Sequence, residues 1–278
     1  MTTAFVLAGG GSLGAIEVGM LAALTGAGVS PDFVVGTSVG AANAAWFALH
    51  PSDVDSLVDQ WVSLRRTDVF PIRPVLGFLG WLGVRDHLVP NTALRRVLER
   101  SLGPIDLTGT AIPVYVGATD VLSGEEVLLS MGPAVEAVLA STAIPGVFPP
   151  VQLDGHYLMD GGAVNNNPVS YAVDLGADKL WVLPTGYACA LTSPPRSALG
   201  VALHALTLLV NHRLALDVER YRDKVELRVV PALCPLEVSP GDFSRGRELI
   251  DAAYARTREW LAAGCPPGSG HTCTPSAQ

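Results

Sequence analysis

Three short motifs carry residue types that together perform acyl-transfer chemistry. They are Gly9-Gly10-Gly11-Ser12-Leu13-Gly14, Gly36-Thr37-Ser38-Val39-Gly40 and Asp160-Gly161-Gly162. A serine hydroxyl is a poor nucleophile until a neighbouring base takes its proton, and the oxyanion that forms must be held by fixed hydrogen-bond donors. We therefore interpret Ser38 as a nucleophile, Asp160 as its base and the first glycine run as the source of the donors.

The G-x-S-x-G sequence around Ser38 is informative because of its flanks. The apolar run 33–35 leads into it, and an Ala-rich stretch, 41–46, leads out of it. This order favours a buried strand, a sharp turn and a helix, which lifts a serine hydroxyl clear of the backbone. Gly36 and Gly40 would then form the two sides of a nucleophile elbow.

Asp160 needs a raised pKa to serve as a base, because a solvated aspartate has a pKa of about 3.9. Its neighbours Leu158, Met159, Ala163 and Val164 are apolar enough to permit burial. Burial raises the pKa of a carboxyl group.

The first glycine run permits two functional interpretations. Spaced as Gly9-x-Gly11-x-x-Gly14, it also fits the dinucleotide fingerprint of an oxidoreductase. That fingerprint requires a carboxylate at the end of the second strand, where this chain has Gly36-Thr37-Ser38. We therefore favour an oxyanion hole built from the amides around Gly10 and Gly11, within the set Gly9, Gly10, Gly11 and Gly14, and expect neither a cofactor nor a metal.

A conventional Ser-His-Asp esterase is the nearest competing mechanism. His156 lies on the same predicted strand as Asp160, about 13 Å away at the usual rise, which is too far for a partner. His204 and His212 fall within a predicted long helix, whereas hydrolase histidines usually follow a strand. The remaining histidines are His50 and His87, which precede the acid, and His271 near the C-terminus.

The elements that must position these residues alternate between strand and helix. Strands are predicted at 3–8, 33–37, 113–119, 125–129, 151–153, 156–159, 179–183 and 225–230, and helices at 14–25, 39–49, 54–64, 91–101, 133–141, 168–175, 197–221 and 243–263. Asn167 is expected to cap the helix that Pro168 opens. This alternation predicts a three-layer α/β/α fold with a central, mainly parallel sheet and a site at the carboxyl ends of the strands.

Composition bounds the remaining possibilities. The 278 residues are 49% hydrophobic and 16% charged, and no linker divides them, which predicts one domain over 1–264 and a disordered tail over 265–278. A net charge of −8 argues against nucleic acid as a partner. The four cysteines show no C-x-x-C spacing and the N-terminus lacks the pattern of a signal peptide or membrane span. We therefore expect free thiols and a cytoplasmic location.

One apolar segment, about 65–90, fits neither a strand nor a helix. It contains Phe78 and Trp81 and lies among several arginines, Arg65, Arg66, Arg73 and Arg85. Aromatic and basic side chains are favourable at a lipid interface, so the segment is interpreted as a cap that makes a peripheral membrane contact. A covered core loop or an oligomer contact explains it equally well.

Four blocks of the chain resemble those of the patatin-like phospholipases, in that family's order. They are the two glycine motifs, then Ala140-Ser141-Thr142-Ala143-Ile144-Pro145 with Phe148 and Pro149, then Asp160-Gly161-Gly162 followed by Asn165-Asn166-Asn167-Pro168. The resemblance implies a serine acyl hydrolase that uses a Ser38–Asp160 dyad without histidine on lipid acyl esters. Many relatives have Arg or Lys where Leu13 stands, which puts any cation beside the oxyanion hole in doubt.

Overall fold

A computed structural model describes residues 1–71, 85–186, 194, 198–234, 236 and 238–265. Its centre is a sheet in the order β5-β6-β3-β2-β1-β7-β8, with β4 also paired to β3. The strands are β1 (Thr3–Leu7), β2 (Phe33–Thr37), β3 (Val114–Asp120), β4 (Glu126–Leu129), β5 (Val151–Leu153), β6 (His156–Asp160), β7 (Lys179–Leu183) and β8 (Glu226–Val229). Strands β3, β2, β1, β7 and β8 run parallel, whereas β4 and β6 pair antiparallel to β3 and β5 pairs antiparallel to β6.

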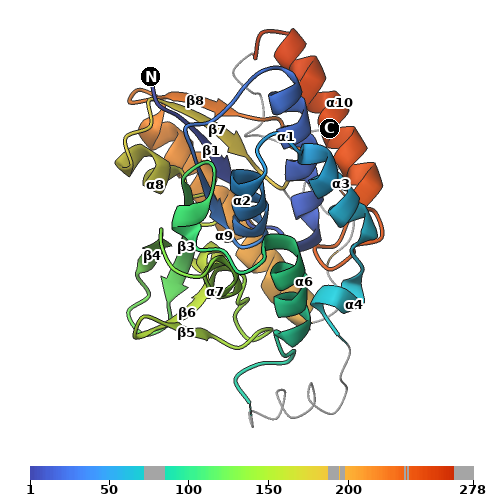
Figure 1. The fold of residues 1–278 in the computed structure, drawn as a ribbon, viewed down its shortest axis with the longest axis vertical. Helices are drawn as coiled ribbons and strands as arrows, with labels where there is room; N and C mark the ends of the chain where they lie inside the picture. The colour runs from blue at the N-terminus through green and yellow to red at the C-terminus, as the bar shows by residue number, and fades with distance from the viewer. Residues whose placement is uncertain (72–84, 187–193, 195–197, 235, 237, 266–278) are drawn as a thin grey trace.

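Helices cover both faces of this sheet. They are α1 (Gly14–Gly26), α2 (Val39–Leu49), α3 (Val54–Ser63), α4 (Arg66–Val69), α6 (Thr92–Leu102), α7 (Ala134–Ser141), α8 (Val169–Asp174), α9 (Ala198–Tyr221) and α10 (Gly246–Ala262). Successive side chains of a strand point to opposite faces. Phe5 and Leu7 belong to one hydrophobic cluster with residues of α1, α2, α3, α6, α7 and α10, whereas Ala4 and Val6 belong to a second with residues of α8 and α9. The predicted three-layer arrangement is confirmed, and Figure 1 shows α9 behind the sheet, opposite α1 and α2.

The predicted elements are present in the described residues, with small shifts at their ends. Helix α8 begins at Val169 with Pro168 as its N-cap, so the prediction that Asn167 caps it is wrong. Helix α10 begins at Gly246, three residues later than predicted, because Asp242 accepts hydrogen bonds from the amide and hydroxyl of Ser244 and forms a turn there.

The segment 65–90 is partly regular. Arg66–Val69 forms the short helix α4, and the amide of Arg65 donates to Asp68 Oδ2 at its start, at 2.9 Å. Residues 72–84 lie outside the described residues, and Phe78 and Trp81 with them. The interpretation of these two side chains as a cap therefore stays a prediction.

The prediction of free thiols is wrong for Cys234, which is disulfide-bonded, while Cys265 is free. Cysteine spacing reveals zinc and redox motifs, but it does not show which distant cysteines the fold brings together. Within the described residues, no helix combines the length and the apolar character that crossing a bilayer requires.

Candidate active site

The turn between β2 and α2 has the geometry of a nucleophile elbow. Ser38 adopts φ 56° and ψ −126°, a strained conformation for a residue with a side chain. A Cβ on Gly36 would lie 2.3 Å from the Gly40 carbonyl oxygen, and a Cβ on Gly40 would lie 2.5 Å from that of Leu7. Backbone therefore packs against backbone on both sides of the serine, and only glycine fits there.

A buried hydroxyl holds the backbone of this turn. The amide of Ser38 donates to Ser141 Oγ at 2.8 Å, and that hydroxyl donates to the Gly117 carbonyl at 2.6 Å. Ser141 is fully buried at the end of α7. The sequence contained this residue within a recognised block, but nothing in its spacing assigned it a role.

Ser38 and Asp160 are in direct contact. Ser38 Oγ donates to Asp160 Oδ2 at 2.6 Å, and the amide of Gly162 donates to Asp160 Oδ1 at 2.7 Å. Both side chains are buried, with 7% of Ser38 and 6% of Asp160 exposed. Strand β6 ends at Asp160 beside Ala118 of β3, which places the carboxylate next to the elbow.

Burial raises the pKa of Asp160 to about 6, although the hydrogen bonds from Ser38 and the Gly162 amide act in the opposite direction. A carboxylate with this pKa is mostly ionised at neutral pH, yet it accepts a proton far more readily than a solvated aspartate does. It therefore has the proton affinity that a general base needs near neutral pH.

The glycine loop, residues 9–14, lies against the elbow. Two of its amides have no hydrogen-bond acceptor among the described residues. A Cβ on Gly9 would lie 3.0 Å from Ser38 Cβ. The Gly9 amide donates to the Asn166 carbonyl at 3.1 Å, and the Gly14 amide donates to the carbonyls of Gly11 and Ser12. Within the described residues, the amides of Gly10 and Gly11 have no hydrogen-bond acceptor.

Gly14 lies in a different environment from the rest of the loop. A Cβ there would lie 2.5 Å from Val39 Cγ2 and 3.0 Å from Trp61, so this glycine lets α1 pack closely on α2 and α3. Of the four glycines predicted for the oxyanion hole, the structure thus leaves Gly10 and Gly11 with available donors. Gly9 and Gly14 shape and anchor the loop.

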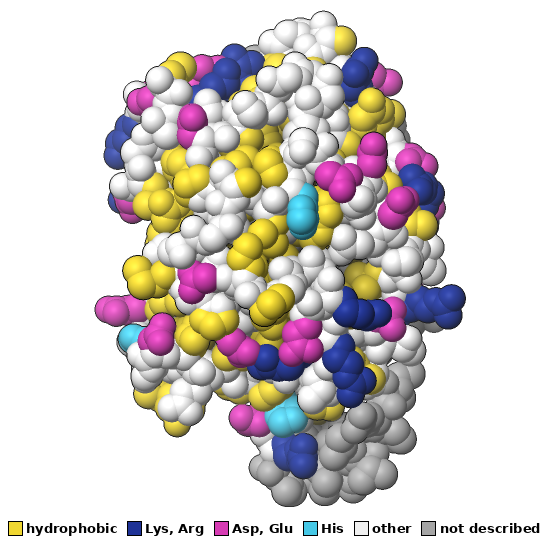
Figure 2. Space-filling view, viewed as in Figure 1, with side chains coloured by type: hydrophobic (Ala, Val, Ile, Leu, Met, Phe, Trp, Pro, Cys, Tyr) yellow, Lys and Arg dark blue, Asp and Glu magenta, His cyan; other side chains and the backbone are white. Residues whose placement is uncertain are grey.

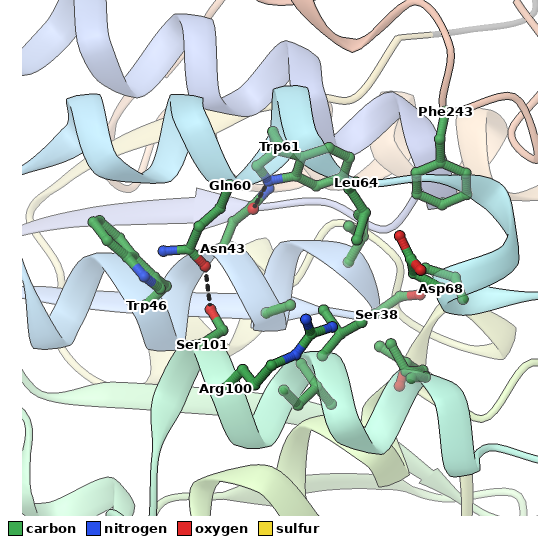
Figure 3. A pocket seen from close by; sticks show the side chains of 18 of the residues that line it. Ser38, Asn43, Trp46, Gln60, Trp61, Leu64, Asp68, Arg100, Ser101 and Phe243 are labelled. Atoms are coloured by element: carbon green, nitrogen blue, oxygen red, sulfur yellow. Dashed lines mark hydrogen bonds between the residues drawn. The ribbon is translucent and has the colours of Figure 1, made fainter.

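An apolar pocket of about 320 Å³ opens beside Ser38, between α2, α3 and α6 (Figure 3). Its α2 wall is formed by Val39, Ala42, Asn43 and Trp46, which are spaced so that they lie on one helical face. The other walls are mostly aromatic and aliphatic, including Leu57, Trp61, Leu98, Phe148 and Phe243.

Polar side chains occur at specific places around the pocket. Ser101 Oγ donates to Gln60 Oε1 at 2.7 Å, and Arg100 and Asp68 also line it (Figure 3). Such a pocket, mostly apolar with a few placed polar groups, is typical of small-molecule sites.

A buried network connects the pocket wall to the glycine loop. Trp61 Nε1 donates to Asn43 Oδ1 at 2.8 Å, and Asn43 Nδ2 donates to Glu17 Oε2 at 2.8 Å. Glu17 Oε1 accepts from the amide of Ala8 at 2.6 Å, next to Gly9. Complete burial raises the pKa of Glu17 well above its usual value. From the sequence, Glu17 stood out only as the single charge between residues 4 and 24.

No described histidine hydrogen-bonds to Ser38 or Asp160. His156 pairs with Asp120 at 2.9 Å, His87 pairs with Asp86, and the His50 ring packs on Trp46 at 4.8 Å between centroids. In the same residues, no cluster of three His, Cys, Asp or Glu side chains is arranged to hold a metal ion.

Comparison with known proteins gives the family. The patatin-like phospholipase family model matches residues 5–173, which include the elbow, the glycine loop and Asp160. The chain belongs to this family. Thr185, which contacts the glycine loop, lies beyond the part of this patatin-like chain that the family model matches.

Individual relatives align with about two thirds of the chain. Patatin-like phospholipase domain-containing protein 7 of Mus musculus is 31% identical over 66% of this chain and 13% of its own length. Lysophospholipase nte1 of Aspergillus terreus is 28% identical over 65% of this chain and 12% of its own length. The chain thus corresponds to about an eighth of these relatives. Among solved structures, VipD from Legionella pneumophila aligns with 94% of this chain and 67% of its own, at 16% identity and a TM-score of 0.46.

Proposed function

We propose that this protein hydrolyses an acyl ester bond of a lipid through a Ser38–Asp160 dyad. The observation that carries the proposal is the 2.6 Å hydrogen bond from Ser38 Oγ to a buried carboxylate, at a strained elbow that opens onto an apolar pocket. An activated serine, a base with a raised pKa and unpaired amides together support covalent acyl transfer.

In the proposed reaction, Ser38 Oγ attacks the acyl carbonyl carbon while its proton passes to Asp160 Oδ2. The amides of Gly10 and Gly11 bind the oxyanion of the tetrahedral intermediate. The intermediate collapses to an acyl-enzyme, and the departing alkoxide takes the proton from Asp160. Water then attacks the acyl-enzyme as Asp160 accepts its proton, and that proton returns to Ser38 when the fatty acid leaves.

The pocket supports an acyl chain as the group that binds beside Ser38. Its walls are mostly apolar, and burying such a chain removes apolar surface from water. One relative is named a lysophospholipase, which favours a phospholipid or lysophospholipid over a neutral glyceride. No observation on the described residues favours a Ser-His-Asp esterase or a dinucleotide-binding oxidoreductase.

Two measurements on the purified chain test this function. A fluorophosphonate probe is expected to label the wild type and not Ser38→Ala, because an activated serine beside an oxyanion hole attacks such probes. Fatty acids released from a panel of phospholipids, lysophospholipids and glycerides then identify the substrate. A folded wild type that takes no label and releases no fatty acid contradicts the proposal.

Peripheral membrane contact is a further part of this proposal. Figure 2 shows Lys and Arg side chains over α4 and α6, interspersed with acidic ones. Together with Phe78 and Trp81, these basic groups would favour a lipid surface. Trp81→Ala and Phe78→Ala are then expected to weaken sedimentation with anionic vesicles and to leave hydrolysis of a short soluble ester intact. Equal loss in both assays indicates a core role instead.

The proposed unit of function is the single domain predicted over 1–264. The cytoplasmic location was expected together with free thiols, and the Cys234 disulfide counts against it, because disulfides persist in oxidising compartments. Alkylation of thiols under denaturing conditions, immediately after cell lysis, measures the redox state of Cys234 where the protein resides.

A further inference from the structure

Thr185 contacts the glycine loop from a part of the chain that no motif identifies. It follows β7, is buried, and its Oγ1 donates to the Gly9 carbonyl at 2.7 Å. Asn166 Nδ2 donates to the same carbonyl at 3.1 Å. Two side chains from separate segments therefore hold one carbonyl oxygen of the loop.

Holding the Gly9 carbonyl also fixes the Gly10 amide. The peptide group between these residues is planar, and in the trans form its C=O and N–H point in opposite directions. With the carbonyl bound to Thr185 and Asn166, the Gly10 N–H is turned away from them. This is one of the two loop amides without an acceptor among the described residues.

Thr185 also limits how this peptide can rotate. A Cβ on Gly10 would lie 2.3 Å from Thr185 Oγ1 and 2.6 Å from Thr185 Cβ, so the threonine packs directly on the Gly10 α-carbon. The preceding residue, Gly9, lies against Ser38, because a Cβ there would lie 3.0 Å from Ser38 Cβ. The peptide thus lies between Ser38 and Thr185, and the two hydrogen bonds from Thr185 and Asn166 select its orientation.

We propose that Thr185 is a positioning residue that aims the Gly10 amide at the oxyanion of the reaction. This inference rests on the proposed function and adds to it a residue beyond the matched segment 5–173. A donor aimed in advance stabilises charge that develops in the transition state and contributes little to binding of the ground-state ester. Loss of the Thr185 hydroxyl should therefore lower kcat and leave KM nearly unchanged.

The test compares Thr185→Val, which keeps the shape and removes the hydroxyl, with Thr185→Ser, which keeps the hydroxyl. On a short soluble ester we expect Thr185→Val to lower kcat about tenfold or more, since small errors in geometry are costly in active sites. KM should stay within about twofold, because uniform binding is untouched. Thr185→Ser should recover most of kcat. Thr25→Val removes a similar hydroxyl bond, to the Leu21 carbonyl on α1, and serves as the control.

The affinity for a trifluoromethyl ketone inhibitor distinguishes a positioning role of Thr185 from a purely structural one, which would leave this affinity unchanged. The inhibitor forms a tetrahedral adduct with the serine and places an oxyanion in the hole. Its affinity should fall in Thr185→Val by the same factor as kcat/KM, as expected for a transition-state analogue. Asn166→Asp, which replaces the second donor to Gly9 by an acceptor, provides an independent variant if Thr185→Val fails to fold. It should lower kcat in the same way.

Certain outcomes overturn the inference and leave the proposed function standing. Wild-type kcat in Thr185→Val, or equal losses in Thr185→Val and Thr185→Ser, shows that the hydroxyl does not aim the amide. Undiminished inhibitor affinity in Thr185→Val shows the same. If instead the wild type has no Ser38-dependent esterase activity, the proposed function itself fails.

Discussion

The Ser38 hydroxyl donates a 2.6 Å hydrogen bond to Asp160 Oδ2, although the two residues are 122 positions apart in the chain. Ser38 follows β2, and Asp160 ends β6, which pairs antiparallel to β3 while β2 pairs parallel to it. The second carboxylate oxygen is held by the Gly162 amide, so the carboxylate is fixed at both oxygens. No imidazole lies between hydroxyl and carboxylate, and a two-residue proton transfer is the chemistry that this contact permits.

The pH dependence of activity should follow Asp160. Because the pKa of Asp160 is raised to about 6 by burial, kcat/KM on a soluble ester should rise with pH through about 6 and level off above it. Asp160→Asn keeps the shape and removes the base, so activity should fall by orders of magnitude. A profile that is flat between pH 5 and 8 in the wild type contradicts the assignment.

The contribution of Asp160 to protein stability should fall with rising pH, whereas its contribution to activity rises. The folded pKa of Asp160, about 6, lies above its unfolded value, so the folded state binds more protons between about pH 4 and 6. Its contribution to stability is present below about pH 4 and is lost as pH rises through 6. The melting temperature of Asp160→Asn relative to wild type should therefore increase over that range. A difference that stays constant with pH excludes this linkage.

Histidine replacements should have little effect on turnover. None of the described histidines hydrogen-bonds to Ser38 or Asp160, and His156 pairs with Asp120. Changing His50, His87, His156, His204, His212 and His271 one at a time to Gln should preserve most of kcat. A true triad histidine would cost about as much as the serine itself. If one histidine variant stays folded and loses as much kcat as Ser38→Ala, the mechanism is a Ser-His-Asp triad and not a dyad.

Gly11 of the glycine loop and Gly28, which follows α1, offer a matched pair of backbone changes. Gly11 has φ 60°, and a Cβ there would lie 2.5 Å from the Pro240 carbonyl, whereas Gly28 has φ 77° and open space around it. Gly11→Ala and Gly28→Ala both impose a left-handed conformation on alanine. Only Gly11→Ala should lower turnover, by about 10²-fold or more if its amide is an oxyanion donor. If both variants have the same kcat, the Gly11 amide is not a donor of the oxyanion hole.

Trp46 should set which acyl chains fit. It is buried in the α2 wall of the pocket, eight residues along α2 from Ser38, or about 12 Å at the helical rise. Trp46→Leu leaves free volume there, so the ratio of kcat/KM for long to short acyl esters should increase. Hydrolysis of the shortest ester should stay close to wild type and serves as the internal control. If the dependence of kcat/KM on acyl-chain length is unchanged in Trp46→Leu, the acyl chain does not bind beside Trp46.

The strands and helices were largely predictable because each has its own signal. Continuous apolar runs marked β1 and β2, as is usual for parallel strands buried on both faces, and the glycines of the elbow marked a turn that only glycine can flank. The roles of Ser141 and Thr185 were not predictable, since each acts through hydrogen bonds to backbone that is distant in sequence. The pairing of Cys234 was missed because cysteine spacing alone does not show which cysteines the fold brings together. Side-chain periodicity reports local structure, whereas these contacts exist only once the sheet is assembled.

Because backbone packs closely on backbone at Gly36 and Gly40, the shape of the elbow and the shape of the pocket can change independently of each other, in evolution or in engineering. The elbow is shaped by main-chain contacts, whereas the pocket is shaped by interchangeable side chains of α2, α3 and α6. Cores tolerate hydrophobic substitution when their volume is conserved. A library that varies the pocket positions of α3 and α6, except Trp61 with its hydrogen bond to Asn43, is therefore expected to explore new acyl preferences while every member keeps the same elbow around Ser38.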